Sequence, residues 1–237
     1  MLSLPEIKNF AIKFQTTEIN ILREYFQHLY LSYFYQSPEA QKVYFKGGTS
    51  LRFVYNSPRF SEDLDFSSTL NGYKISKIVV EAVKRISIEL DVNLEDVKPT
   101  SGGFLAILKT KIYEMPLRIE LNISLRKKDI SGETILISPK IIPAYTANIL
   151  KENQLVKEKI QAVIYRKKPR DYFDLYYILR ARIAVEEIFP YKQKIIKDIE
   201  VLNNKEIRNE LKIFLPQSYW AILKNFKDVL LKELERL

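Results

Sequence analysis

Hydrophobic and polar positions along the first part of the chain predict helices and strands in alternation. Apolar residues recur at helical spacing from about Thr16 to Gln36, where a threonine can cap the helix start, and again from about 75 to 90. Between them, short apolar runs predict strands at 43–45 and 63–67, with a helix at 49–55. The predicted order is strand, glycine turn, helix, loop and strand.

Two further runs alternate strongly enough to predict a β-hairpin, residues 104–113 and 117–125, with a turn at Glu114-Met115-Pro116. The second run places its apolar side chains on one face and Glu120 in the middle of the polar face. One more short strand is predicted at 134–137.

The remainder of the chain is helical in pattern. Helices are predicted over residues 148–166, 171–182, 191–202, 205–214 and 218–237. Pro139 and Pro143 mark the boundary. We therefore expect an α+β fold, with a small mixed sheet flanked by helices over residues 1–140 and a mainly helical C-terminal half over 141–237.

The composition restricts the kinds of site that are possible. The chain has 237 residues, no cysteine and a single histidine, His28, which excludes disulfides, thiolate metal sites and a histidine-rich zinc centre. Any metal must rely mainly on carboxylates, which points to Mg²⁺ or Mn²⁺. His28 lies on the first predicted helix, and we expect a surface or partly satisfied side chain rather than a catalytic one.

Charge and hydropathy indicate where the protein acts and on what. No signal peptide is apparent, and no apolar run approaches the roughly 18 residues of a membrane span, so we expect a soluble, cytoplasmic protein without a membrane partner. The net charge of +9, from 38 basic and 29 acidic residues, favours a polyanionic partner such as nucleic acid.

The most informative stretch is a glycine turn followed by an acid pair. Gly47-Gly48 opens onto a helix, and such a turn can present backbone N–H groups and a helix dipole to an anion. Asp63 and Asp65 alternate with apolar residues on a strand, so both carboxylates face the same way and repel each other unless a cation is bound. A phosphate cradle beside a magnesium site predicts phosphoryl or nucleotidyl transfer. Glu120 is either a solvent-exposed residue or a third metal carboxylate.

A second cluster of charged residues lies in the helical half. Residues 151–182 contain nine basic and four acidic side chains, and the turn Arg166–Arg170 is densely basic. Asp171 and Asp174 share one face of the next helix, and Asp171 near its start is a typical dipole-stabilised acid. The functional alternative is that Lys159 or Arg166 neutralises a pyrophosphate leaving group and that the turn holds a nucleic-acid backbone.

These residues together resemble a known family. The runs 46–52 (KGGTSLR) and 59–66 (RFSEDLDF), the setting of Glu120 between Ile119 and Leu121, and Lys159 with the RDxxDL run at 170–175 are similar to motifs of the AbiEii/AbiGii toxins. Those toxins belong to the DNA polymerase β-like nucleotidyltransferase superfamily. The resemblance covers roughly residues 40–180, and fourteen residues separate Gly48 from Asp63.

The resemblance implies a nucleotidyltransferase core at 1–140 and an Mg²⁺-dependent transfer of NMP from an NTP to an RNA hydroxyl, with the tRNA 3′ end as the inherited acceptor. Asp63, Asp65 and Glu120 would hold the metal. The nucleotide would be bound by the glycine turn, the helix start and two cations, namely Gly47, Gly48, Thr49, Ser50, Arg52 and Lys159. Asp171 would position the acceptor or Lys159. The family also implies a winged-helix antitoxin as partner.

Two alternatives stay open at this stage. One is a degenerate transferase that acts only as an RNA- or protein-binding module, which the presence of all three acids and the diglycine disfavours. The other keeps the chemistry but uses a small molecule or a protein side chain as acceptor. The charge of +9 favours RNA over that acceptor.

Overall fold

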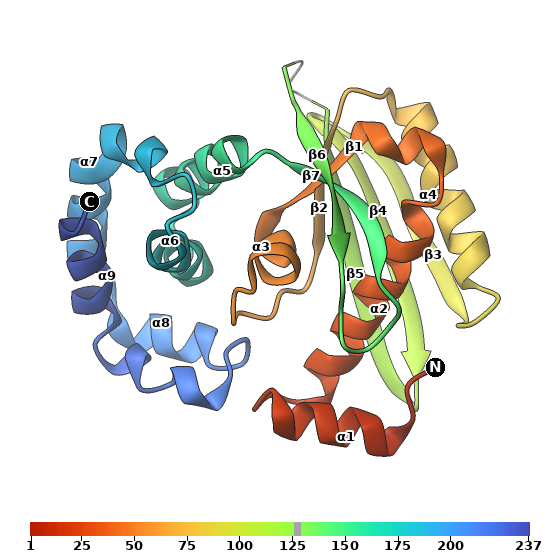
Figure 1. The fold of residues 1–237 in the computed structure, drawn as a ribbon, viewed down its shortest axis with the longest axis horizontal. Helices are drawn as coiled ribbons and strands as arrows, with labels where there is room; N and C mark the ends of the chain where they lie inside the picture. The colour runs from red at the N-terminus through yellow and green to blue at the C-terminus, as the bar shows by residue number, and fades with distance from the viewer. Residues whose placement is uncertain (126–128) are drawn as a thin grey trace. The chain divides into compact units, whose positions relative to one another are not determined.

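The computed structural model describes residues 1–125 and 129–237, which form two compact units (Figure 1). The first unit comprises residues 1–54 and 60–150, and the second comprises 55–59 and 151–237. The chain thus enters the second unit for five residues, Tyr55–Arg59, before it returns to the first. The division expected at 140/141 placed residues 141–150 in the second unit and residues 55–59 in the first, and this partition places each of them in the other unit.

Within the described part of the first unit, seven strands form one mixed sheet in the order β3-β4-β5-β2-β1-β7-β6. The strands are β1 (Val43–Lys46), β2 (Leu64–Ser68), β3 (Val92–Thr100), β4 (Gly103–Ile112), β5 (Met115–Ser124), β6 (Gly132–Ile137) and β7 (Tyr145–Leu150). β1 runs parallel to β7 and antiparallel to β2, and β2 runs parallel to β5. The predicted α+β class with a mixed sheet is confirmed.

This unit has four α-helices among its described residues, and the side chains of Ser3, Thr17 and Asn71 cap the starts of three of them. They are α1 (Leu4–Lys13), α2 (Glu18–Phe34), α3 (Gly47–Tyr55) and α4 (Gly72–Ile86), with a 3-10 turn at Pro38–Lys42. The hydroxyl of Thr17 accepts from the N–H of Asn20 at the start of α2, as the sequence predicts. α1 was not predicted, and α4 ends at Ile86 rather than at residue 90.

Two strands, β3 and β7, were not predicted from the sequence, and the reasons differ. β3 lies at the edge of the sheet and carries charges and Pro99, which are typical of protected edges and obscure its alternation. β7 reads as the start of a helix, but Asn148 pairs with Thr134 of β6, so the predicted helix at 148 begins only at Glu152. The hairpin turn lies at Tyr113-Glu114, both with positive φ, and not at Glu114–Pro116.

The second unit is helical, as predicted. Its helices are α5 (Glu152–Tyr165), α6 (Pro169–Ala181), α7 (Lys192–Glu200), α8 (Asn204–Leu211) and α9 (Phe226–Glu235), with 3-10 segments at Val185–Tyr191, Gln217–Tyr219 and Ile222–Lys224. The single helix predicted over 218–237 is therefore wrong in its first part, where 3-10 segments lie, and only α9 is an α-helix. Phe173 of α6 and Phe226 of α9 stack with ring centroids 6.0 Å apart in its core. No helix among the described residues has the length and hydropathy that a membrane span requires.

Candidate active site

Gly47 and the carboxylate of Asp65 lie in direct proximity. β1 pairs with β2 so that Lys46 is opposite Asp65, and the chain turns into α3 at the next residue. Gly47 has φ +83°, and a Cβ there would lie 2.8 Å from the Cβ of Asp65 and 2.9 Å from its carboxyl carbon. A side chain at residue 47 is thus excluded by backbone conformation and by space. The glycine turn and Asp65 are therefore adjacent in space, and a shared functional site stays a prediction.

Asp63, Asp65 and Glu120 are brought together by the register of two parallel strands. Leu64 pairs with Leu121, so the same register carried back by one residue sets Asp63 beside Glu120. Burial and the negative charges of Asp65 and Glu120 raise the pKa of the Asp63 carboxyl to about 6. Glu120 is half-buried and forms an ion pair of 2.6 Å with Arg118 on its own strand. The structure therefore gathers the three predicted acids around Asp63.

These acids fit a hard divalent cation by their chemistry. Among the described residues, no group of three Asp, Glu or His side chains is already arranged to hold a metal ion. Asp63 and Asp65 nevertheless supply the oxygen ligands that Mg²⁺ prefers, and their mutual repulsion is the cost that a bound cation removes.

The hydroxyls at the start of α3 are used inside the turn. Thr49 Oγ1 donates to the backbone oxygen of Asp63, and Ser50 Oγ donates to the backbone oxygen of Gly47 at 3.0 Å. Both residues are only 1% exposed. The N–H groups of the first turn of a helix have no partner within the helix, so α3 can still offer backbone donors to an anion. Any nucleotide contact by this turn is then expected from its backbone.

Arg52, one turn further along α3, is engaged on two sides. Its guanidinium pairs with Glu24 of α2 and lies 3.5 Å from the ring centroid of Phe60. Phe60 is buried and directly precedes the segment that carries Asp63. Arg52 thus holds α2, α3 and that segment together, and the predicted contact with a nucleotide stays a prediction.

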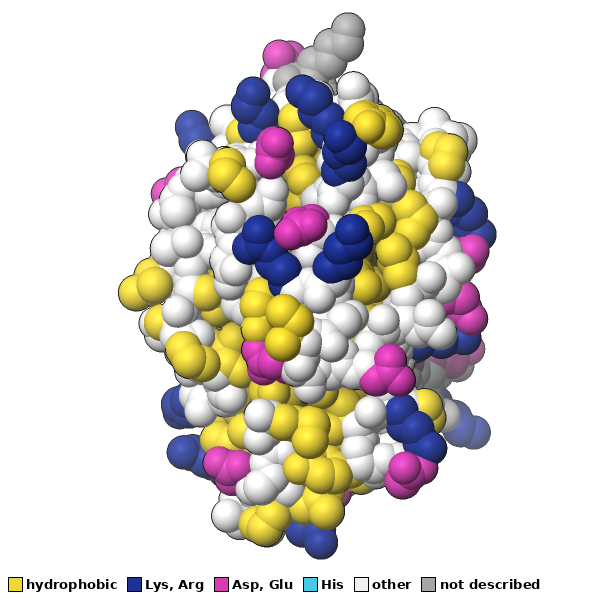
Figure 2. All heavy atoms as spheres, turned by 90° about the vertical axis from the view of Figure 1, so that its right-hand side faces the viewer, with side chains coloured by type: hydrophobic (Ala, Val, Ile, Leu, Met, Phe, Trp, Pro, Cys, Tyr) yellow, Lys and Arg dark blue, Asp and Glu magenta, His cyan; other side chains and the backbone are white. Residues whose placement is uncertain are grey.

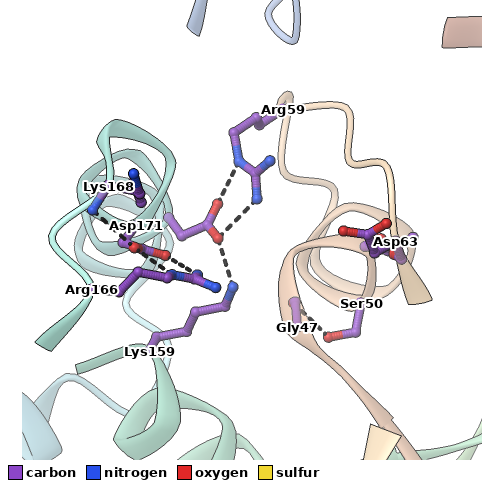
Figure 3. Close-up of polar contacts among 10 residues, drawn as sticks. Gly47, Ser50, Arg59, Asp63, Lys159, Arg166, Lys168 and Asp171 are labelled. Carbon is purple, nitrogen blue, oxygen red and sulfur yellow. Dashed lines mark hydrogen bonds and ion pairs between the residues drawn. The ribbon is translucent and has the colours of Figure 1, made fainter. Parts of the chain in front are cut away.

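In the second unit, Arg59 and Lys159 both donate to the carboxylate of Asp174. Figure 3 labels these two cations and marks their contacts with dashed lines. Arg59 donates from Nε and Nη2 at 2.8 and 2.9 Å, and Lys159 Nζ donates at 2.7 Å. Burial alone would raise the pKa of Asp174, but the charges and hydrogen bonds of Arg59 and Lys159 outweigh it and lower the pKa to about 2. Lys159 is 7% exposed, so its ammonium is held in a buried ion cluster. Sequence reasoning gave Arg59 no role, although an arginine flanking the acid motif was a usable signal.

Asp171 is fully buried and caps α6. Its carboxylate accepts from Arg166 Nε at 2.9 Å and from the backbone N–H of Lys168 at 3.1 Å, as Figure 3 shows. This geometry is that of a first-turn acid, and a catalytic role for Asp171 stays a prediction. Arg166 pairs with Asp171, while Arg59 and Lys159 pair with Asp174, so two carboxylates of α6 each hold cations in this cluster.

A family model described as "Nucleotidyl transferase AbiEii toxin, Type IV TA system" matches residues 29–230. The chain is therefore a nucleotidyltransferase. It belongs to the AbiEii family of toxins from type IV toxin–antitoxin systems, and membership implies an NTP substrate and an antitoxin partner.

Solved structures share the fold at low sequence identity. MenT4, a nucleotidyltransferase toxin from Mycobacterium tuberculosis H37Rv, aligns over 100% of this chain and 91% of its own, with a TM-score of 0.69 and 17% identity. JHP933 from Helicobacter pylori aligns over 93% of this chain and 95% of its own, with a TM-score of 0.56 and 21% identity. No protein of curated function matches the chain in sequence.

Proposed function

We propose that the protein transfers a nucleoside monophosphate from an NTP to a hydroxyl of an RNA, with the 3′ end of a tRNA as acceptor, and that transfer requires Mg²⁺ or Mn²⁺. The proximity of Gly47 to Asp65 carries the proposal, because it sets an anion-binding turn against an acid pair. Family membership supports the NTP substrate.

Each residue of the site has a proposed role. Asp63 and Asp65 hold the metal, and Glu120 is the third carboxylate ligand. The bound ion would neutralise triphosphate charge and lower the pKa of the attacking hydroxyl. Backbone N–H groups of the turn at Gly47, Gly48, Thr49 and Ser50 bind the β- and γ-phosphates.

The basic residues bind and orient the nucleotide. Arg52 braces the phosphate-binding turn through Glu24 and Phe60. Lys159 contacts the phosphates or the base, as its positive charge and its place beside Arg59 on Asp174 favour. Asp171 holds Arg166 and the start of α6, and so positions Lys159 or the acceptor.

The distribution of charge supports RNA as the acceptor. The second unit carries 20 Lys and Arg against 13 Asp and Glu, a net charge of +7, whereas the first carries 18 against 16, a net charge of +2. Figure 2 shows one face of the molecule, where cationic and anionic side chains are interspersed rather than gathered by sign. We therefore propose that the basic turn Arg166–Arg170 of the second unit contacts the phosphate backbone. The proposed antitoxin is a winged-helix protein, and the proposed compartment is the cytoplasm.

The direct test is incubation of the protein with each labelled NTP, Mg²⁺ and total RNA. We expect label in RNA for the wild type and none for Asp63→Ala, with circular dichroism showing that the variant is folded. Wild-type incorporation by Asp63→Ala would refute the assignment of Asp63. Transfer to a small molecule or a protein in place of RNA would refute the acceptor while keeping the enzyme class.

The RNA contact is tested separately by retention on immobilised RNA across a salt series. Replacing Lys167, Lys168 and Arg170 with alanine should weaken retention and flatten its salt dependence, because fewer phosphate contacts release fewer counterions. Replacing three lysines of the first unit, Lys74, Lys77 and Lys84, is the matched control and should leave the salt dependence unchanged. Equal retention of both triple variants would contradict the proposed contact between the basic turn and the RNA backbone.

A further inference from the structure

The chain around Asp63 is held by side chains from two other elements of the first unit. The backbone oxygens of Ser61 and Glu62 both accept from Gln27 Nε2, at 3.0 and 2.9 Å. The backbone oxygen of Asp63 accepts from Thr49 Oγ1. The peptide groups on both sides of Asp63 are therefore fixed by side-chain donors, so the direction in which the carboxylate leaves the backbone is fixed as well.

Gln27 is placed on α2 for this contact. It is 1% exposed, and one amide nitrogen serves two consecutive carbonyls more than thirty residues away. A buried amide costs free energy unless it is hydrogen-bonded, so the burial of Gln27 is explained by these two bonds. No motif of the sequence includes Gln27, and sequence reasoning missed it.

Thr49 has its hydroxyl committed to the same task. The residue is 1% exposed and bonds to Asp63, which lies fourteen positions further along the chain. Because its proton is donated to a backbone oxygen, the hydroxyl is not free to donate to a phosphate. The threonine of the glycine turn thereby links the phosphate-binding helix to the acid pair.

We propose that Gln27 and Thr49 are positioning residues that hold the Asp63 carboxylate toward Asp65 and Glu120. This inference rests on the proposed role of Asp63 as a metal ligand. Three carboxylates of like charge repel one another, and Asp63 without restraint would turn away from the other two. Clamping both flanking peptides fixes the direction of the Asp63 Cα–Cβ bond, so the backbone cannot shift to carry the carboxylate away from the other two before a cation arrives.

The experiment compares Thr49→Val and Gln27→Met with the wild type, using Mn²⁺ binding without nucleotide, measured by electron paramagnetic resonance. Loss of a residue that orients a ligand should raise the Mn²⁺ dissociation constant about tenfold or more. Thr49→Ser keeps the donor and should bind Mn²⁺ as the wild type does. Thr110→Val is the matched control, since Thr110 is also buried and donates to a backbone oxygen, that of Asp91 at 2.7 Å.

Transfer kinetics supply the second readout. For Thr49→Val and Gln27→Met we expect kcat at sub-saturating Mn²⁺ to fall about tenfold or more, with KM for the NTP within about twofold of the wild type. A rise in KM with unchanged Mn²⁺ affinity would show that Thr49 contacts the nucleotide and would overturn the proposal. Unchanged Mn²⁺ affinity in both variants would overturn it too.

Hydrogen exchange separates this inference from the proposed function. Amides of residues 61–64 should exchange faster in both variants than in the wild type and in Thr110→Val, whatever the enzyme transfers. Wild-type protein that binds Mn²⁺ but labels no RNA would refute the acceptor and leave the positioning role standing. Ser61 and Glu62 are partly exposed, so water can reach their carbonyls and Gln27→Met is expected to fold.

Discussion

Arg59 and Asp174 form a two-pronged ion pair, in which Nε and Nη2 of the guanidinium donate to the two carboxylate oxygens at 2.8 and 2.9 Å. Arg59 is 4% exposed and Asp174 is 1% exposed. Arg59 ends the short segment Tyr55–Arg59 that the second unit takes from the first part of the chain. Tyr177, one turn after Asp174, donates to the backbone oxygen of Tyr55, so one face of α6 holds both ends of that segment.

Replacing the acid of this cluster should lower the free energy of unfolding more than replacing its arginine. Asp174→Asn removes the carboxylate that pairs directly with buried Arg59 and Lys159 and should destabilise the protein by about 3–5 kcal/mol. Arg59→Met leaves Asp174 paired with Lys159 at 2.7 Å, and the loss of its charged hydrogen bonds should cost about 2 kcal/mol. Urea unfolding measures both.

The control for these variants is Arg180→Met on the same helix. Arg180 pairs with Glu233 at 3.2 Å while its own side chain is 55% exposed, so the loss should be less than about 1 kcal/mol. An order in which Arg59→Met costs more than Asp174→Asn would mean that the guanidinium, and not the balance of charge, stabilises the cluster.

Gly47→Ala should abolish transfer. The added methyl group meets the Asp65 side chain, and the backbone φ of +83° disfavours any L residue by about 1–3 kcal/mol. Displacement of the carboxylate should also weaken Mn²⁺ binding. Gly72→Ala is the matched control, because no atom lies within 4 Å of a Cβ at the start of α4. Transfer by Gly47→Ala at a wild-type rate would remove the support for an acid pair that depends on this turn.

The sequence was sufficient for the parts of the site that local patterns encode. The glycine turn, the alternation that exposes Asp63 and Asp65, and Glu120 on a polar strand face are all local features, and the structure gathers these acids. That proximity depends on a parallel pairing of β2 with β5 across more than fifty residues, which no local pattern specifies.

Polar contacts between residues far apart in the chain could not be predicted from the sequence. Gln27 looks like an ordinary polar position of α2, and only the fold shows that it meets two backbone oxygens. His28 was expected at the surface or partly satisfied, but it is 3% exposed and bonded to Tyr145. β7, which supplies Tyr145, was not predicted as a strand, and its last three residues were assigned to a helix beginning at Asn148, so neither contact could be inferred from spacing.

Asp63→Asn should stabilise the protein at neutral pH. Burial and the charges of Asp65 and Glu120 raise the Asp63 pKa to about 6 from its ordinary value of 3.8, so the folded state binds more protons than the unfolded state between these values. Stability is therefore lost as pH rises from about 4 to above 6, by up to about 3 kcal/mol, and the variant avoids this loss. Urea unfolding at pH 4 and pH 7.5 should show a gain for the variant only at the higher pH.

Mg²⁺ provides the check on that result. A bound cation removes the repulsion, so Mg²⁺ should raise the melting temperature of the wild type at pH 7.5 and have little effect on Asp63→Asn. Equal stability of the two proteins at pH 7.5 without Mg²⁺ would mean that the Asp63 carboxyl is not destabilised by its neighbours.

His28 should remain neutral well into the acid range. Burial, and then the charge of Arg52, lower its pKa to about 3, while Nδ1 lies 2.8 Å from Tyr145 Oη and the ring stacks on Phe53. Its folded pKa is below the unfolded value of 6.5, so stability is complete above about pH 6.5 and falls by several kcal/mol as pH drops toward 3. Because it is the only histidine in the chain, its ring resonances in an NMR titration are unambiguous, and they should not shift between pH 8 and pH 5. Tyr145→Phe should leave that result unchanged, because burial rather than the tyrosine hydroxyl is the main cause; a midpoint near 6 in either protein would show that the ring is accessible to water.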